Sequence, residues 1–365
     1  MRRGATRRLL LWFGRHKRDL PWREPFPRDP YFVLVAEMMA QQTQVERVAP
    51  AYRRFLERFP TVAVLAAAPV DDVVHAFSGL GYYRRARQLH QAAVVIAAGG
   101  WPRTVAALRR LPGLGAYTSA AVAAFAFGGS EAPVDGNIAR ITARLEAEKL
   151  RLGSAALLQR ARAVASRLHR QEPTPEVWEA LMELGATVCT PARPRCGVCP
   201  LASVCAARAH GDPESYPLPR RTRPREHQLW AALWLERADG RVLLRRVNEG
   251  ALLTGLWLPP FRLARDERHA RTVARALAGE AGYSGALAGA ETVRHTITHR
   301  NVRVVPFVLQ VAALATRDRD GGWSWQQADA PAVPTSSLLA KLARACRPVL
   351  DAQSAGRAWR REGER

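Results

Sequence analysis

"LPGLGAYTSAA", residues 111–121, places two glycines in a short turn and follows them with small side chains that favour a helix. Gly113 and Gly115 offer permissive backbone angles, so one helix is expected to end at the turn and another to begin directly after it. The N–H groups at the start of the second helix would suit a phosphate oxygen. The alternative is an ordinary helix–helix turn. Tyr117, two residues after the last glycine, is the side chain that this turn presents.

Helical periodicity dominates residues 1–205 around this turn. Five segments repeat apolar residues at i, i+3 and i+4, namely 51–59, 70–77, 85–98, 104–111 and 157–170. Short stretches rich in proline and glycine separate them, and no segment of this half alternates convincingly like a strand. The pattern predicts an all-α domain over residues 1–205.

The composition of the sequence changes at residues 206–226, which are rich in proline and charged residues and lack hydrophobic periodicity. We therefore expect an interdomain linker there. Beyond it, "LWAALWL" and "RVLLRRV" flank the turn "ERADG" (236–240), which predicts a β-hairpin. "VRVVPFVLQVAA" (302–313) predicts another strand, and "RHARTVARALAGEAG" (268–282) predicts an amphipathic helix.

These signals predict an α+β domain over residues 227–350. The charged residues 351–365 are expected to form a disordered tail.

The charge of the chain points to a polyanionic partner. The formal net charge is +23, from 55 basic and 32 acidic residues. Lys17, Lys149 and Lys341 are the only lysines, which indicates a bias toward arginine codons. Such a bias replaces lysine but does not create the excess of positive charge, so nucleic acid is the simplest partner. The apolar run after the basic N-terminus is too short for a secretory signal, and other apolar runs are shorter than a membrane span. We expect a cytoplasmic, nucleoid-associated protein with no membrane contact.

Two carboxylates stand out as candidates for acid–base chemistry. Glu37 lies in the apolar helical stretch "VAEMMAQQTQV" (35–45), where apolar surroundings raise the pKa of a carboxyl group and suit it to act as a general acid. Asp135 precedes Gly136 and Asn137 at an expected helix start in "APVDGNIARI". An N-cap aspartate is the structural alternative. Together the two suggest the carboxylate pair that cleaves a glycosidic bond.

Four of the five cysteines lie within 17 residues. Cys189, Cys196, Cys199 and Cys205 follow the pattern C-x6-C-x2-C-x5-C, which indicates metal or cluster ligation rather than disulfides. Zinc is the generic interpretation of four clustered thiolates. Cys346 lies apart and is expected to be a core thiol.

Five further motifs accompany the hairpin and the cysteines: "LPWR" (20–23), "EMMAQQTQV" (37–45), "GLGYYRRAR" (79–87), "VDGNIAR" (134–140) and "LMELGATVC" (181–189). The combination resembles the endonuclease III superfamily of DNA glycosylases, and most closely its adenine DNA glycosylase (MutY) family, over about the whole chain. The resemblance implies a multidomain protein: an all-α helix-hairpin-helix glycosylase domain with an iron–sulfur loop, followed by an α+β MutT/Nudix-like domain. It also implies a [4Fe–4S] cluster on the four cysteines, in place of zinc.

The family removes adenine mispaired with 8-oxoguanine or guanine from double-stranded DNA by hydrolysis, after flipping the nucleotide out. Bifunctional relatives carry a lysine where this chain has Tyr117, and that lysine forms a Schiff base that nicks the strand. A phenol cannot form one, so the resemblance implies a monofunctional enzyme of base excision repair. Two alternatives are a bifunctional endonuclease III-type glycosylase/AP lyase and a catalytically silent DNA-binding protein.

The resemblance also implies roles for individual residues. Glu37 would protonate adenine at N7 and later activate water, and Asp135 would stabilise or trap the sugar cation, with Tyr117 and Asn137 hydrogen-bonding nearby. The remaining implied contacts are Arg18, Trp22, Arg23 and Glu179 in the adenine pocket, Gln42 and Tyr82 as wedges in the duplex, and Thr43, Leu80 and Gly81 near the oxidised guanine. Core packing or plain solvation is the alternative for each of these. Ala40 stands where the family has a larger aliphatic residue, which predicts a looser pocket.

In the second domain, "GLWLPP" (255–260) and the following helix resemble a Nudix scaffold. Glu280 has no adjacent pair of glutamates, so we expect no pyrophosphohydrolase activity. Ile297, Thr298 and His299 occupy the family's Phe-Ser-His recognition loop, where Thr298 keeps the hydroxyl group but Ile297 loses the aromatic ring. We expect a monomer, and the sequence does not identify partner proteins.

Overall fold

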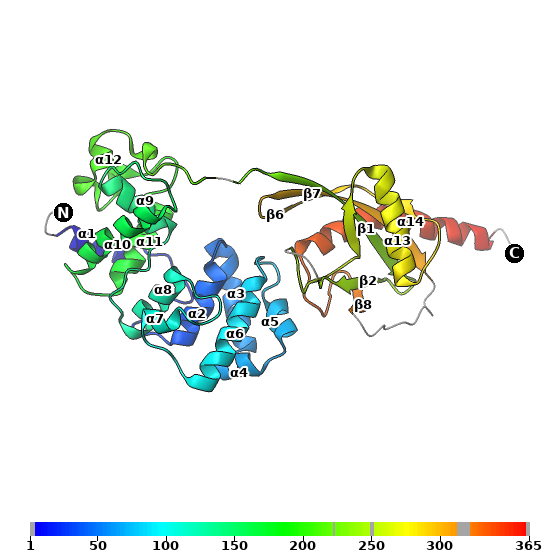
Figure 1. Ribbon diagram of the computed structural model, residues 1–365, viewed down its shortest axis with the longest axis horizontal. Helices are drawn as coiled ribbons and strands as arrows, with labels where there is room; N and C mark the ends of the chain where they lie inside the picture. Colours follow the sequence, from blue (N-terminus) through cyan, green and yellow to red (C-terminus); the bar gives the residue numbers. More distant parts are fainter. Residues whose placement is uncertain (1–3, 222, 249–251, 312–321, 363–365) are drawn as a thin grey trace. The chain divides into compact units, whose positions relative to one another are not determined.

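The computed structural model describes residues 4–221, 223–248, 252–311 and 322–362 (Figure 1). The chain divides into two compact units. The first contains residues 1–68 and 84–222, and the second contains residues 69–83 and 223–365. No helix among the described residues is both long enough and apolar enough to span a lipid bilayer.

Residues 4–205 are helical, as predicted for residues 1–205, and one further short helix follows. The helices are α1 (Ala5–His16), α2 (Pro30–Ala40), α3 (Val45–Arg58), α4 (Val62–Ala67), α5 (Val70–Ala76), α6 (Arg84–Gly99), α7 (Val105–Leu108), α8 (Ala116–Phe127), α9 (Gly136–Leu145), α10 (Ala155–His169), α11 (Glu176–Thr187) and α12 (Ala206–Ala209). Helix α8 is almost wholly buried because its alanines let neighbouring backbones approach closely. It packs against α2, and α9 packs against α10 and α11.

The hairpin between α7 and α8 forms where the two glycines predicted it, but the glycines play different parts. Gly113 has φ +80°, and a Cβ atom there would lie 2.6 Å from Gln88 Cβ, so no other residue fits. Gly115 is the N-cap of α8 with φ −79°, an ordinary extended angle. The prediction of a permissive angle at Gly115 is therefore wrong. What Gly115 provides is open space beside the first N–H groups of the helix.

The expected linker is much shorter than residues 206–226. Residues 206–222 belong to the first unit and include α12 and a 3-10 turn at Pro213–Ser215. Tyr216 is buried, and its carbonyl oxygen accepts a hydrogen bond from Arg144 Nε at 3.0 Å. Leu152 and Leu218 also share a backbone hydrogen bond. The sequence pattern does not predict these contacts, because isolated residues hold the segment in place. A periodic pattern would require a repeating apolar face, which this proline-rich, charged segment lacks.

The second half contains a mixed sheet of eight strands within the described residues. They are β1 (Glu226–Arg237), β2 (Arg241–Arg246), β3 (Trp257–Leu258), β4 (Phe261–Ala264), β5 (Ala288–Gly289), β6 (Val293–Ile297), β7 (Arg300–Val311) and β8 (Trp323–Gln327). Strands β1 and β2 form the predicted antiparallel hairpin, with Glu236 opposite Val242. The central pair, β1 and β7, is parallel over its whole length. The last two residues of the predicted strand 302–313 lie outside the described residues.

One helix covers each face of this sheet. Along β1, Trp230 and Trp234 join one core with α14 (Ser337–Glu362), while Leu233 joins the other with α13 (Glu267–Ala281). A strand buried on both faces reads as a continuous apolar run, which is why "LWAALWL" does not alternate. Cys346 is fully buried in the α14 core, as predicted.

The predicted disordered tail is wrong in the described region, because α14 continues to Glu362. The alanine- and arginine-rich composition of residues 351–362 has a high intrinsic helix propensity, and this propensity outweighs the charge of the segment. The end of the tail, residues 363–365, lies outside the described residues.

Candidate active site

A cavity of about 410 Å³ in the helical unit brings together several of the predicted site residues. Trp22, Arg23, Glu37 and Glu179 line it. The other lining residues are Arg28, Val33, Ala36, Phe125 and Met182. Glu37 reaches the cavity from α2, a helix whose other side chains are almost all apolar. Burial is the main cause that raises the pKa of Glu37 to about 7, as expected for a carboxyl group in apolar surroundings.

Tyr117 in the first turn of α8 connects the two candidate carboxylates. Its hydroxyl group donates a hydrogen bond to Met182 Sδ at 3.8 Å. Its interaction with the Glu37 carboxyl group lowers the pKa of Glu37, whereas the charge of Asp135 raises it. Burial followed by the charges of Glu37 and Asp135 raises the pKa of Tyr117 well above its ordinary value. The hydroxyl group therefore stays protonated and acts as a donor. The structure thus brings Glu37, Tyr117 and Asp135 into one electrostatic cluster.

Asp135 is the N-cap of α9, and it also faces this cluster. Its Oδ1 accepts a hydrogen bond from Ile138 N at 2.8 Å, and its Oδ2 accepts one from Asn137 Nδ2 at 2.8 Å. Burial raises the pKa of Asp135, and these two donors counteract the rise by stabilising the anion. The N-cap alternative and the functional interpretation therefore coexist, because one oxygen caps the helix and the other is held by Asn137.

Asn137 is held in turn by two elements. A Cβ atom on Gly185 of α11 would lie 2.4 Å from Asn137 Cβ, so the contact between α9 and α11 requires glycine. Arg140 Nη2 donates to Asn137 Oδ1 at 2.7 Å and to Gly185 O at 2.9 Å, while its Nε donates to Cys189 O at 2.8 Å. A chain of hydrogen bonds therefore runs from the Asp135 carboxylate to the first residue of the cysteine loop.

A buried network of ion pairs forms one wall of the cavity. Arg28, which is 8% exposed, donates through both Nη atoms to Glu179 at 3.0 Å each. Arg23 Nη2 donates to Glu183 Oε2 at 2.7 Å, and Arg18 Nε donates to Glu183 Oε1 at 2.8 Å. Burial raises the pKa of Glu183, but the hydrogen bonds from these two arginines outweigh it and lower the pKa overall. Arg18 thus binds Glu183 and is not among the residues that line the cavity.

The residues expected to enter the duplex lie on turns with unusual backbone angles. Gln42 has φ +54° and Tyr82 has φ +51°, both in the left-handed region that non-glycine residues rarely adopt. Both side chains are exposed, Tyr82 to 44%. Thr43, Leu80 and Gly81 are their chain neighbours, and Leu80 is buried. Ala40 is the last residue of α2, and the described cavity lining includes Ala36 but not Ala40.

Thr298 and His299 form the two-residue turn between β6 and β7 in the second unit. Thr298 has φ +55°. His299 Nε2 lies 2.9 Å from Glu226 Oε1, and Arg300 Nε lies 2.7 Å from Glu226 Oε2, so the start of β1 braces the turn. Elsewhere in this unit, Glu280 on α13 pairs with Arg262 at 2.7 Å and with Arg245 at 3.1 Å.

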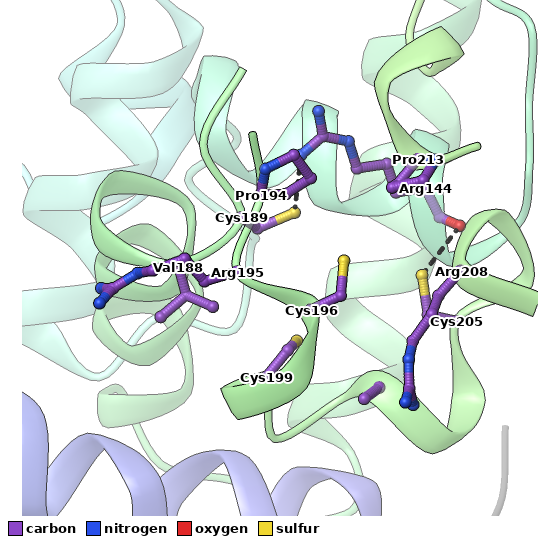
Figure 2. A pocket seen from close by; sticks show the side chains of 11 residues that line it. Arg144, Val188, Cys189, Pro194, Arg195, Cys196, Cys199, Cys205, Arg208 and Pro213 are labelled. Carbon is purple, nitrogen blue, oxygen red and sulfur yellow. Dashed lines mark hydrogen bonds between the residues drawn. The ribbon is translucent and has the colours of Figure 1, made fainter. Parts of the chain in front are cut away.

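Four thiols line one pocket of the helical unit, as Figure 2 shows. They belong to the four predicted ligands, Cys189, Cys196, Cys199 and Cys205, all free thiols. Arg144 Nη1 donates to Cys189 Sγ at 3.3 Å, and Cys205 Sγ donates to Arg144 O at 3.4 Å. Among the described residues, no three His, Cys, Asp or Glu side chains converge on a site for a single metal ion.

Several functional candidates escaped the sequence analysis, notably Arg28, Glu183, Arg140 and Arg144. Arg140 and Arg144 had a usable signal, because they repeat at i+4 after the Asp135 cap and share a helix face. Arg28 and Glu183 had none, because their partners lie more than 150 residues away in the chain.

Comparison with known proteins places this site in a class. The model of the HhH-GPD superfamily of base excision DNA repair proteins matches residues 35–175, a range that contains Glu37, Tyr117 and Asp135. A solved structure of a thermostable thymine-DNA glycosylase is 29% identical, with a TM-score of 0.50, and the match covers 56% of this chain and 95% of that one. The fold and the site therefore define a helix-hairpin-helix protein of base excision DNA repair.

Sequence relatives narrow the class. The adenine DNA glycosylase of Mycobacterium tuberculosis is 44% identical over 216 residues, which cover 58% of this chain and 70% of the relative. The human adenine DNA glycosylase is 42% identical over 216 residues, 56% of this chain, but the match covers only 40% of the human protein. The chain belongs to the adenine DNA glycosylase family.

Proposed function

We propose that this protein is a monofunctional glycosylase that hydrolyses the N-glycosidic bond of adenine mispaired with 8-oxoguanine or guanine in duplex DNA. The observation that carries the proposal is the electrostatic cluster of Glu37, Tyr117 and Asp135, of which Glu37 lines a cavity in the helical unit. We take adenine as the base that is removed, because the relatives are adenine DNA glycosylases. Such an enzyme would act on chromosomal DNA in the cytoplasm, and the net charge of +23 favours its association with that polyanion.

The chemistry follows from the ionisation of the two carboxyl groups. Protonated Glu37 gives its proton to N7 of the flipped adenine, and the bond between the sugar C1′ and N9 breaks with its electron pair leaving on the base. The anionic Asp135 then faces the positive sugar carbon. Ionised Glu37 takes a proton from a water molecule whose oxygen bonds to C1′. Tyr117 remains a hydrogen-bond donor throughout, because its raised pKa keeps the phenol protonated.

A glycosylase assay separates this function from its alternatives. Duplexes with adenine opposite 8-oxoguanine, guanine or cytosine are incubated with the protein and then analysed with and without alkali. We expect release of adenine opposite 8-oxoguanine and guanine, with strand breaks only after alkali, because no lysine replaces Tyr117. Breaks without alkali would indicate the bifunctional alternative. Binding without release of adenine would indicate the silent DNA-binding protein.

The same proposal includes a [4Fe–4S] cluster on the four cysteines of the pocket near α9. Burial, together with the charges of neighbouring cysteines, raises the pKa of Cys199 to about 12, so thiolates there require a strongly cationic group to stabilise them. Four thiols that line one pocket provide the donor set that such a cluster binds. When bound, the cluster would hold the loop together, with Arg195 and Arg208 beside it for contact with phosphates.

Iron content tests the cluster. We expect the purified protein to be brown and to contain roughly four irons per chain. Cys196→Ser should lose most of this iron, because it removes one ligand. Cys346→Ser is the matched control, since that thiol lies in the core of the other unit, and it should keep the iron. A colourless, active protein that contains zinc would contradict the cluster.

The β6–β7 turn is the proposed site for the oxidised guanine, through the Thr298 hydroxyl group and the His299 ring. Because Glu226 braces the turn, its two side chains are presented in a defined orientation. Replacing both by alanine should lower the preference for 8-oxoguanine over guanine by about tenfold, the value of one or two hydrogen bonds. Release of adenine opposite guanine should stay nearly unchanged.

This preference is measured as the ratio of single-turnover rates on the two duplexes. Thr296→Ala is the control, because Thr296 is an exposed residue on β6 two positions before the turn. If the double variant and the control had the same ratio as the unmodified protein, the turn would have no part in recognising the lesion.

A further inference from the structure

The guanidinium group of Arg85 binds the end of α2, three residues beyond Glu37. Arg85 belongs to the first turn of α6 and is only 5% exposed. Its Nη1 donates to Met38 O at 3.0 Å, to Met39 O at 2.9 Å and, over a shorter distance, to Gln41 O. The last carbonyl groups of a helix lack donors within the helix and carry its negative dipole end, so a buried cation there stabilises the terminus.

The same side chain also fixes the turn that follows. Arg85 Nη2 donates to Thr43 Oγ1 at 3.1 Å, and that hydroxyl group donates to Gln41 O at 3.2 Å. Gln41 Nε2 donates to Thr118 Oγ1 at 3.1 Å, which ties the turn to α8 beside Tyr117. The bonds of Arg85 therefore lie on both sides of Gln42, whose φ of +54° costs roughly 1 kcal/mol and persists only where the surroundings enforce it.

We propose that Arg85 is a positioning residue that locks the end of α2, and so presents Gln42 to the duplex and Glu37 to the flipped base in one fixed relation. The inference rests on the proposed glycosylase function. A single guanidinium fork contacts the helix end and the turn at once, so it joins the group that enters the duplex to the group that protonates the base. A lysine cannot do this, because its single ammonium group lacks the planar fork.

Two variants test the proposal. Arg85→Lys keeps the charge but loses the fork, while Arg84→Lys is the matched control at the exposed neighbouring position. Hydrogen–deuterium exchange of residues 36–47 in the free protein and the single-turnover rate of adenine release are measured for both. For Arg85→Lys we expect faster exchange in that segment and a rate at least about tenfold lower, because small misplacements of reacting groups have large effects. Arg84→Lys should change neither quantity.

If Arg85 had a purely structural role, its replacement would lower stability independently of residue 42. A double-mutant cycle measures the energetic coupling between Arg85 and Gln42. Glycine at position 42 relieves the backbone cost, so the loss of Tm caused by Arg85→Lys should be smaller in a Gln42→Gly background. Additive losses of Tm, or an Arg85→Lys protein with unchanged exchange or an unchanged rate, would overturn the proposal. If the unmodified protein released no adenine, the proposed function would fail, whereas the exchange and the cycle would still decide the role of Arg85.

Discussion

Glu37→Gln is expected to reduce adenine release by about 10³-fold while leaving the affinity for duplex DNA nearly unchanged. General acid catalysis contributes on the order of 10²–10⁴-fold, and glutamine offers no proton to N7. Binding should survive, because a carboxyl group is not a ligand for phosphates. Single-turnover rates and a binding titration measure the two effects. A variant that released adenine at more than a tenth of the normal rate would show that the acid has been misassigned.

The same residue predicts the pH dependence. Glu37 must be protonated to act, and its pKa is raised to about 7. The single-turnover rate should therefore fall about tenfold per pH unit above that value. A rate that stayed constant up to pH 9 would contradict Glu37 as the acid.

The raised pKa of Glu37 also makes a prediction for stability. The folded protein holds this proton up to about pH 7, whereas the unfolded chain releases it near 4.5. Stability is therefore lost as pH rises between these values, because the buried carboxylate is disfavoured. Glu37→Gln escapes this loss, so its Tm should exceed that of the unmodified protein at pH 8 and match it near pH 4.5. A lower Tm at pH 8 would contradict the burial of this charge.

Asp135→Asn is expected to have the second largest effect, a loss of roughly 10²–10³-fold in adenine release with almost no loss of stability. Asparagine removes the charge that faces the sugar cation. It caps a helix as well as aspartate does, and the Ile138 N–H keeps its acceptor. Thermal unfolding and single-turnover rates separate the two roles of this residue.

Asp135→Ala is the matched comparison for this variant. It should lose activity to the same extent and also lose about 1 kcal/mol of stability, because the cap disappears. If Asp135→Asn stayed active while Asp135→Ala became unstable and inactive, Asp135 would be a helix cap and nothing more.

Local sequence patterns predicted the fold well where the structure of a segment depends mainly on its own residues. The hairpin at residues 111–121, the helices of the first half and the β1–β2 hairpin depend on periodicity, glycine angles and turn residues that are close in sequence. The same reasoning failed at residues 206–222 and 351–362. Isolated contacts, rather than a repeating apolar face, hold the first of these segments. In the second segment, the helix propensity of the residues outweighs their charge.

The residues of the candidate site also fall into those that the sequence could identify and those that it could not. Glu37, Asp135 and the four cysteines were identifiable from residue type and spacing, and Tyr117 from the family resemblance. The structure brings Glu37, Asp135 and Tyr117 into one electrostatic cluster. Arg28 and Arg85 were not identifiable in this way, because each acts on a group far away in the chain. Arg28 meets Glu179 across 151 residues, and Arg85 meets the end of α2 across more than 40.

By itself, the sequence indicated the candidate catalytic groups: a carboxyl group in an apolar helix, a capping aspartate and a tyrosine that cannot form a Schiff base. Only the tertiary structure decided how those groups ionise and where they are held. The pKa of Glu37 depends on burial by α2 and its neighbours and on the charges of Asp135, Glu179 and Arg28. Electrostatic interactions weaken with the distance between groups in space. The separation of two residues along the chain does not give that distance.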